Sequence, residues 1–359
     1  MSALVKNLPF SPLFTGSALY LLTRSPPHIQ QTALDAVLSV LSPKNTARLI
    51  TSLKWLLALG LVRNTSNYLS KWADNDYQIF GSTKGWVWEK EIAVVTGGSS
   101  GFGALFAKDL SDKGIHVVVL DINGLPPHLQ NNSKISFYKC DVTDADAVKA
   151  VAREVQSDVG HPSILINNAG IGADKTILET SPQFLKKIFG VNLFSHYYTL
   201  QAFMPDMLQK RKGHIVNIAS IASFIATAGI VDYSCTKVAA LALHEGLRAE
   251  LRSTHKCPEI KTTVVHPIWA DTPLIASGKA HLQKNNQIIL NPQVVADAVV
   301  KQILNGRSGQ IVLAPGIGAG VSSLRGFPMW IQETLRRLFE PGPVDLGNPD
   351  SMLPGSAKQ

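Results

Sequence analysis

The sequence predicts an α/β protein, with a doubly wound parallel sheet, helices on both of its faces and an apolar helical extension at the N-terminus. Two observations lead to this prediction. From Glu91 onward, short β-branched apolar runs alternate with longer stretches of helical periodicity. Residues 1–88 lack this alternation and contain the apolar run LITSLKWLLALGLV, Leu49–Val62. Near-continuous apolar strands separated by helices are typical of a parallel sheet covered on both faces.

The same patterns divide the chain into three parts. Residues 1–88 form the apolar extension, residues 89–340 the α/β domain, and residues 341–359 a tail rich in Pro, Gly and Ser. A tail of that composition is expected to be disordered. The expected strands are IAVVT, HVVVL, ISFYK, ILIN, HIVNI, KTTVV and QIVLA, with helical patterns such as TDADAVKAVAREVQ between them.

Composition narrows the classes of partner. The formal net charge is +8, but the basic residues are scattered and form no zinc finger, RNA-recognition motif or aromatic-interleaved stripe, so no nucleic acid is expected. Only 17% of the residues are charged, and a basic, apolar chain suits an anionic membrane surface. The three cysteines, Cys140, Cys235 and Cys257, have no metal-ligand spacing and leave an odd thiol. We therefore expect no metal, no disulfide framework and a reducing compartment.

The Leu49–Val62 run has three interpretations. It is shorter than the roughly 20 apolar residues that cross a bilayer, and it lies too far from the N-terminus for a signal peptide. A buried or dimer-forming helix, an in-plane or re-entrant membrane anchor, and a single span that includes flanking residues remain open. Arg48, Lys54 and Arg63 at and within the run favour contact with a membrane surface, and we expect a monotopic anchor.

A glycine-rich loop, TGGSSGFG (Thr96–Gly103), follows the first expected strand and opens the first expected helix. Glycines let the backbone approach a pyrophosphate, and the start of a helix offers N–H groups to it. Asp121 ends the second strand, 24 positions after Gly97, where a carboxylate can accept the ribose hydroxyls of NAD and repel the extra phosphate of NADP. The pattern predicts a Rossmann-type site that prefers NAD over NADP. Its loop contacts are expected from Gly97, Ser99, Ser100, Gly101, Phe102 and Gly103.

Tyr233 and Lys237 lie four positions apart at the start of a long helical pattern. This spacing brings both side chains to one face of a helix. An ammonium within about 4–6 Å stabilises a phenolate, as does the positive nicotinamide of NAD⁺, so the two together are expected to bring the pKa of Tyr233 towards the range where it can exchange a proton with an alcohol. On the spacing alone, an acid/base couple and a surface tyrosine beside a solvated lysine both remain open.

These features together resemble the short-chain dehydrogenases/reductases. The loop TGGSSGFG is similar to the T-G-x-x-x-G-x-G loop of that family, and Ser220 precedes Tyr233 by the family's 13 residues. The other matching motifs, in the family's order, are CDVTD (Cys140–Asp144), NNAG (Asn167–Gly170), VN (Val191–Asn192) and IVNIAS (Ile215–Ser220). The resemblance covers about Glu91 to Thr272 and is specific as a set.

The resemblance implies further cofactor contacts. Asp141 and Val142 would flank the adenine, and Asn168, Ala169 and Gly170 would guide the cofactor along the strand ends. Beyond the sixth strand, Pro267 and Thr272 would also contact the cofactor. The family usually has Pro-Gly there, but this chain reads HPIWADTP with Ile268 in place of the glycine. That departure puts the backbone contacts around Ile268 in doubt.

The resemblance also implies the catalytic set. Tyr233 would exchange a proton with the substrate hydroxyl, and Ser220 would hydrogen-bond the substrate oxygen. Lys237 would also bind the nicotinamide ribose, and Asn192 would brace Lys237 through a kinked helix and a water. The nearby Ser223 is expected to be a loop or helix-cap hydroxyl. We expect His196, His244 and His266 to be structural histidines with satisfied hydrogen bonds.

Within the family, the stretch from Val191 to Leu251 is similar to membrane-associated retinol dehydrogenases and lipid-droplet 17-beta-hydroxysteroid dehydrogenases. This resemblance implies hydride transfer between NAD(H) and a lipophilic retinoid-, steroid- or fatty-type alcohol or ketone. It also implies a homodimer on the cytosolic face of a membrane, at the endoplasmic reticulum or a lipid droplet if the source is eukaryotic. The alternatives are a soluble NADPH-dependent ketoreductase of a secondary metabolite and a non-catalytic NAD-binding scaffold.

Overall fold

The computed structural model describes residues 10–339. They divide into two compact units, of which the first ends at Ile79 and the second begins at Phe80. The predicted tail at 341–359 lies outside the described residues. Residues 80–88, which the sequence places in the extension, belong to the second unit, where the Ser82 N–H donates to the carbonyl of Gly306.

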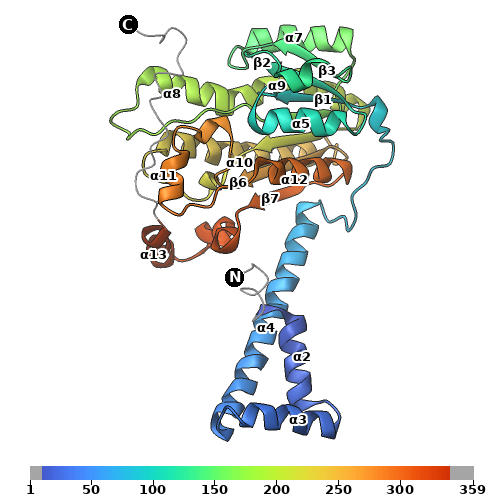
Figure 1. Cartoon of the computed structure of the whole chain (residues 1–359). Coiled ribbons are helices and arrows are strands. Elements are labelled where there is room, and N and C mark those ends of the chain that lie inside the picture. The colour runs from blue at the N-terminus through green and yellow to red at the C-terminus, as the bar shows by residue number, and fades with distance from the viewer. Residues whose placement is uncertain (1–9, 340–359) are drawn as a thin grey trace. The chain divides into compact units, whose positions relative to one another are not determined.

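The described residues of the first unit contain three α-helices, α2 (Pro12–Thr23), α3 (Pro27–Leu38) and α4 (Pro43–Asp74). Each begins with a proline in its first turn, where the missing N–H costs nothing. The three helices form a triangle (Figure 1), and the start of α2 packs on α4 so closely that a Cβ at Gly60 would lie 3.3 Å from Cγ of Pro12. The Leu49–Val62 run lies inside α4. Among the described residues, no helix has the length and apolar character needed to cross a membrane.

The second unit contains a seven-stranded parallel sheet in the order β3-β2-β1-β4-β5-β6-β7. All seven predicted strands are confirmed. Their bounds are β1 Ile92–Thr96, β2 His116–Asp121, β3 Ile135–Lys139, β4 Ile164–Asn167, β5 His214–Ile218, β6 Lys261–Pro267 and β7 Gly309–Leu313. The order reverses between β1 and β4, and such a switch point is where dinucleotides bind in this architecture.

Helices cover both faces of this sheet (Figure 1), so the doubly wound prediction is confirmed. One core cluster joins alternate strand residues such as Val95 and Val119 to Phe106 of α5 and Val299 of α12. The helices of that face are α5 (Gly101–Ser111) and α12 (Pro292–Leu304). Burial on both faces explains why the strands read as continuous apolar runs.

The second core cluster lies on the opposite face. It joins Val94 and Leu165 to Val155 of α7, Phe203 of α9 and Leu247 of α10. These helices are α7 (Ala145–Asp158), α9 (Ser195–Lys210) and α10 (Val231–Ser253). The remaining elements are α6 (Pro127–Gln130), α8 (Pro182–Phe189), α11 (Lys279–Lys284), α13 (Met329–Phe339), a π-helix (Gly190–Phe194) and four 3₁₀ turns (Trp88–Lys90, Ile221–Ser223, Pro273–Ile275 and Gly316–Gly326).

Candidate active site

The glycine-rich loop connects β1 to α5 at the switch point. A Cβ at Gly97 would lie 2.9 Å from the Cα of Ala169, and one at Gly103 would lie 2.1 Å from the Gly97 carbonyl oxygen. Gly97 and Gly101 also have positive φ, which other residues rarely adopt. These positions therefore require glycine, and the tight turn sets the opening of α5 at the strand ends. The residues fit a pyrophosphate in the way that the sequence predicts.

Asp121 lies at the end of β2, next to this loop. Its Oδ2 accepts the Ser99 N–H at 3.0 Å and its Oδ1 accepts the Asn123 N–H at 2.9 Å. Ser99 adds a second link, because its hydroxyl donates to the Asn123 carbonyl at 2.8 Å. Each carboxylate oxygen can accept more than one hydrogen bond, so the group keeps capacity for ribose hydroxyls. The carboxylate is thereby fixed beside the phosphate loop.

Thr96 joins the loop to the NNAG segment after β4, a role that was missed in the sequence. Its hydroxyl oxygen accepts the N–H groups of Asn168 and Ala169 at 3.0 and 3.1 Å. The Asn168 side chain returns the contact by donating to the carbonyls of Thr96 and Gly97. Gly170 follows, and a Cβ there would lie 3.8 Å from the Lys237 ammonium. The segment therefore leads from the phosphate loop to Lys237.

Asp141 and Val142 lie beyond β3, further from this centre. Asp141 is exposed and its Oδ1 accepts the Thr143 N–H and hydroxyl, while Val142 is buried. Their predicted place at the adenine end stays a prediction. Ser100 is exposed and Phe102 half-buried at the start of α5.

Asn192 lies in the π-helix Gly190–Phe194, an irregular turn between α8 and α9. Its Oδ1 accepts the Ile171 N–H at 2.8 Å, and its Nδ2 donates to the Ile171 carbonyl at 2.9 Å and to the Thr236 hydroxyl at 3.1 Å. The side chain is fully buried. It ties the segment after β4 to the helix that carries Lys237. Thr236 and Ile171 give no sequence signal for this role, because it depends on the π-turn.

Ser220, Tyr233 and Lys237 meet at the carboxyl ends of β5 and β6. The Lys237 ammonium lies 5.4 Å from the centre of the Tyr233 ring and donates to the Ile218 carbonyl at 2.9 Å. The Ser220 hydroxyl hydrogen-bonds to Tyr233 and also accepts the Ala222 N–H at 3.2 Å. The three predicted catalytic side chains are thus in one place, with Asn192 on the neighbouring helix.

The protein groups by themselves raise the pKa of Tyr233; the expected lowering includes the charge of the nicotinamide and stays a prediction. Burial raises the pKa of Tyr233 to about 12, and the hydrogen bond from Ser220 only partly offsets this. Burial also lowers the pKa of Lys237 to about 8. Removing a charged form from water costs more here than the pair gains by attraction. Lys237, not Tyr233, is the group with a pKa near neutrality.

Ser223 lies beside this group, as the turn residue expected. Its hydroxyl is fully buried and donates to the Lys237 carbonyl at 2.8 Å. His266 lies at the end of β6, where its Nδ1 forms a hydrogen bond with the Ser220 carbonyl at 2.9 Å. The centroid of its ring lies 4.5 Å from the centroid of the Phe224 ring. Both contacts fix the turn that presents Ser220.

The prediction that the histidines are satisfied is wrong in part. Both ring nitrogens of His196, Nδ1 of His244 and Nε2 of His266 are buried without a hydrogen-bond partner among the described residues. Burial lowers the pKa of His196 and His244 to about 3, and of His266 to about 4. All three are therefore neutral at physiological pH. No cluster of potential metal ligands occurs among the described residues.

The segment after β6 borders the site, and its backbone accommodates Ile268 without strain. Its N–H donates to the Leu313 carbonyl at 3.0 Å, which prolongs the pairing of β6 with β7, and its φ is not positive. The glycine usual in the family is therefore not needed at this position. Thr272 lies against the phosphate loop, with its Cβ 3.5 Å from where a Cβ at Gly101 would lie. Pro267 is buried, and its carbonyl accepts the Ser220 hydroxyl at 3.4 Å.

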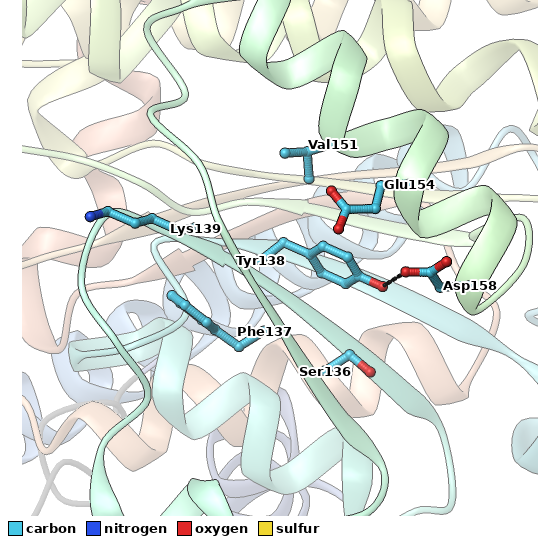
Figure 2. Close-up of a pocket in the computed structure, with 7 residues that line it drawn as sticks. All are labelled: Ser136, Phe137, Tyr138, Lys139, Val151, Glu154 and Asp158. Atoms are coloured by element: carbon cyan, nitrogen blue, oxygen red, sulfur yellow. Dashed lines mark hydrogen bonds between the residues drawn. The ribbon is translucent and has the colours of Figure 1, made fainter.

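A separate open depression of about 570 Å³ lies at the edge strand β3 (Figure 2). Its lining residues are Ser136, Phe137, Tyr138, Lys139, Val151, Glu154 and Asp158. The Tyr138 hydroxyl donates to Asp158 Oδ2 at 3.2 Å. None of the predicted site residues lines this depression.

Comparison with known proteins agrees with this geometry. The model of the short chain dehydrogenase family matches residues 91–283. Dehydrogenase RED2 of Cochliobolus heterostrophus is 40% identical over 212 residues, which are 58% of this chain and 78% of the relative. Human retinol dehydrogenase 10 is 30% identical over 245 residues, which cover 60% of this chain and 71% of that protein.

Solved structures show the same fold. Aldohexose dehydrogenase of Thermoplasma acidophilum superposes with a TM-score of 0.55 at 27% identity, over 64% of this chain and 94% of the other. Together with the phosphate loop and the Ser220–Tyr233–Lys237 arrangement, the match over more than half of the sequence identifies the chain: it belongs to the short chain dehydrogenase family of NAD(P)-dependent oxidoreductases.

Proposed function

We propose that this protein transfers hydride between NAD(H) and the carbinol or carbonyl carbon of a lipophilic alcohol or ketone of retinoid, steroid or fatty type. The observation that carries the proposal is the surroundings of Tyr233. Its ring packs against two apolar clusters, one built on Ile230, Ile275 and Leu282 and the other on Ala173, Phe184 and Ile188. A substrate oxygen at Tyr233 and Ser220 would therefore have apolar side chains on both sides, which suits a greasy molecule.

Two partly buried side chains extend the first cluster, Trp269 and Ile289. Both come from the segment that follows β6, whose ends are joined by Leu290 N–H to the Trp269 carbonyl and Asp271 N–H to the Leu290 carbonyl. An ion pair between Lys279 and Asp271 at 2.7 Å lies within the same segment. The segment thus presents apolar groups to Tyr233 and keeps its charges at its own surface.

In oxidation, Tyr233 takes the proton of the substrate hydroxyl while the C–H bond of the carbinol carbon breaks. Ser220 holds the substrate oxygen, and Lys237 stabilises the phenolate before the transfer. Bound NAD⁺ supplies the hydride acceptor, and NADH supplies the donor for the reverse reaction. The Ile218 carbonyl and Asn192, through Thr236, keep Lys237 and its helix in place. In reduction, the Tyr233 hydroxyl returns the proton to the substrate oxygen.

The test is the formation of NADH during incubation of the full chain with retinol, a steroid alcohol, a long-chain alcohol and a short water-soluble alcohol. We expect turnover of at least one lipophilic alcohol and little of the short one, because only a large apolar substrate covers both clusters. Turnover only of polar ketones with NADPH would indicate the ketoreductase alternative. Cofactor binding without turnover of any alcohol or ketone would leave the scaffold alternative.

We infer a preference for NAD from the place of Asp121. Asp121→Asn is expected to lower the ratio of kcat/KM with NAD to kcat/KM with NADP about tenfold or more, because it removes the repulsion of a 2′-phosphate. The amide oxygen can accept only one of the Ser99 and Asn123 N–H groups that the carboxylate accepts, so the thermal unfolding of the variant is measured alongside its kinetics. Asp141→Asn is the matched control, since that carboxylate lies away from the loop. An unchanged ratio in Asp121→Asn means that another residue sets the preference.

We also propose that the first unit anchors the protein to the cytosolic face of a membrane, where its thiols stay reduced. Within α4, Trp55, Leu59 and Val62 are exposed, with Trp55 at 69%. Between Phe10 and Lys71 the chain has six Lys and Arg and one acidic residue, Asp35. Exposed apolar side chains beside basic ones suit an anionic bilayer surface. The location of this membrane, at the endoplasmic reticulum or at a lipid droplet, stays a prediction. The homodimer also stays a prediction.

A further inference from the structure

The second unit, which carries the active-site residues, is called the catalytic unit from here on. Its C-terminal part exposes a second apolar and basic surface. We call it the α13 surface and define it by Phe327, Met329, Trp330, Arg337 and Leu338. Trp330 is 72% exposed and Leu338 70%, and the two lie eight positions apart, on one side of α13. In Figure 1, α13 lies outside the helical layers that cover the sheet. Large apolar side chains gathered in this way mark an interaction surface.

The opposite side of α13 is held to the protein, so the exposed side chains are not the result of a loose end. Gln332 is buried, and its Nε2 donates to the carbonyls of Phe327 at 2.7 Å and Arg325 at 3.3 Å. Leu324, just before the helix, is also buried. The helix is therefore fixed with its polar anchor inward and Trp330 and Leu338 outward.

The charge of this element indicates what covers it. Residues 321–339 contain Arg325, Arg336 and Arg337 and one acid, Glu333, which pairs with Arg336 at 2.8 Å. An aromatic and aliphatic face flanked by arginines complements a bilayer surface with anionic headgroups, where the rings enter the acyl boundary and the arginines meet phosphates. The first unit, proposed above as a membrane anchor, is basic as well. One anionic lipid surface can meet both basic surfaces, whereas a protein partner would need acidic groups placed to match the α13 arginines, so a lipid surface is favoured.

We propose that the α13 surface is a second membrane-docking site, which holds the catalytic unit against an anionic lipid surface. It deepens the membrane association proposed above and rests on it. A hydrogen bond from Arg325 Nε to the Phe224 carbonyl, at 3.2 Å, joins this element to the turn that presents Ser220. Phe224 in turn packs on His266, which pairs with the Ser220 carbonyl. The docking site is thus attached to the part of the active site that receives the substrate oxygen.

The test is hydrogen exchange of the full chain, followed by mass spectrometry, with and without vesicles. Vesicles of phosphatidylcholine with about one-third phosphatidylserine are compared with pure phosphatidylcholine. We expect amides at 327–338 to exchange about tenfold more slowly on the anionic vesicles. Trp330→Glu with Leu338→Glu should abolish that protection, whereas Val294→Glu, an exposed apolar position on α12, should leave it unchanged.

The same measurement separates this proposal from the anchor. Protection of α2 and α4 without protection of 327–338 would support the anchor and overturn the α13 surface. Protection of 327–338 that rises with protein concentration and needs no vesicles would assign the surface to a second copy of the chain. Protection without vesicles at every concentration would mean that the chain itself covers it. Either result overturns membrane docking, and none of these readings requires the enzyme to turn over a substrate.

Discussion

Tyr233→Phe is expected to lower kcat by a factor of about 10³ or more, since general acid–base catalysis contributes up to about 10⁴ and no neighbouring group can replace the lost proton carrier. The nearest hydroxyl, that of Ser220, is committed to the substrate oxygen, and the nearby histidines are neutral and buried. NAD binding should stay nearly intact because the ring and its apolar contacts remain. The measurements are kcat with a lipophilic alcohol and the Kd for NADH by fluorescence.

The matched control is Tyr138→Phe, which removes one tyrosine hydroxyl and its 3.2 Å bond to Asp158 at the β3 edge (Figure 2). It should leave kcat unchanged. Turnover of Tyr233→Phe within tenfold of the wild type would remove Tyr233 from the mechanism and leave the two apolar clusters as a binding site only.

Lys237→Met is expected to change the pH dependence as well as the rate. Lys237 loses its proton at about pH 8 in the folded protein, below the ordinary value for lysine, whereas Tyr233 alone would require about pH 12. The first proton therefore leaves Lys237 near pH 8, and the form with phenolate and ammonium, which is active in oxidation, is a minor tautomer of that same deprotonated state. Oxidation should rise with pH up to about 8 and then level off. Reduction, which needs the protonated pair, should be constant below about pH 8 and fall above it.

Without the ammonium, only Tyr233 titrates, at about pH 12. At pH 8 oxidation should then be about 10- to 10³-fold slower, because an opposite charge within about 4–6 Å shifts a pKa by about 1–3 units, and the break near pH 8 should vanish. The measurement is kcat/KM in both directions between pH 6 and pH 10, and Lys108→Met, at an exposed lysine of α5, is the control. A break near pH 8 that persists in Lys237→Met would show that another group, not Lys237, sets the first proton release.

The strands were predictable almost to the residue because a sheet covered on both faces leaves few polar positions inside them. β1 and β4 are apolar along most of their length, and each ends where a motif with a chemical role begins. The glycine loop was equally readable, because Gly97 and Gly103 are required by distances within the loop and to its neighbour. Local sequence and short-range sterics fix both features.

The ionisation of the site was not predictable, since it depends on packing between distant segments. Tyr233 has a raised pKa because clusters from α8, α11 and the segment after β6 surround it. The spacing of Tyr233 and Lys237 gives their proximity but not this burial. The link through Thr96 and the unpartnered nitrogens of His196 likewise follow from contacts between elements that are far apart in sequence.

The π-helix at Gly190–Phe194 also sets the rotational phase of everything after it. A π-turn holds about one residue more than an α-turn, so α9 is turned by roughly 100° relative to a straight continuation of α8. Before the turn, Phe184 and Ile188 face the cluster at Tyr233; after it, Phe203 and Met207 face the core beneath α7 and α10. Deleting one residue in this segment would leave a regular helix whose two halves could not both be buried. This stretch therefore has a fixed length, and the number of residues in it is as constrained as their identity.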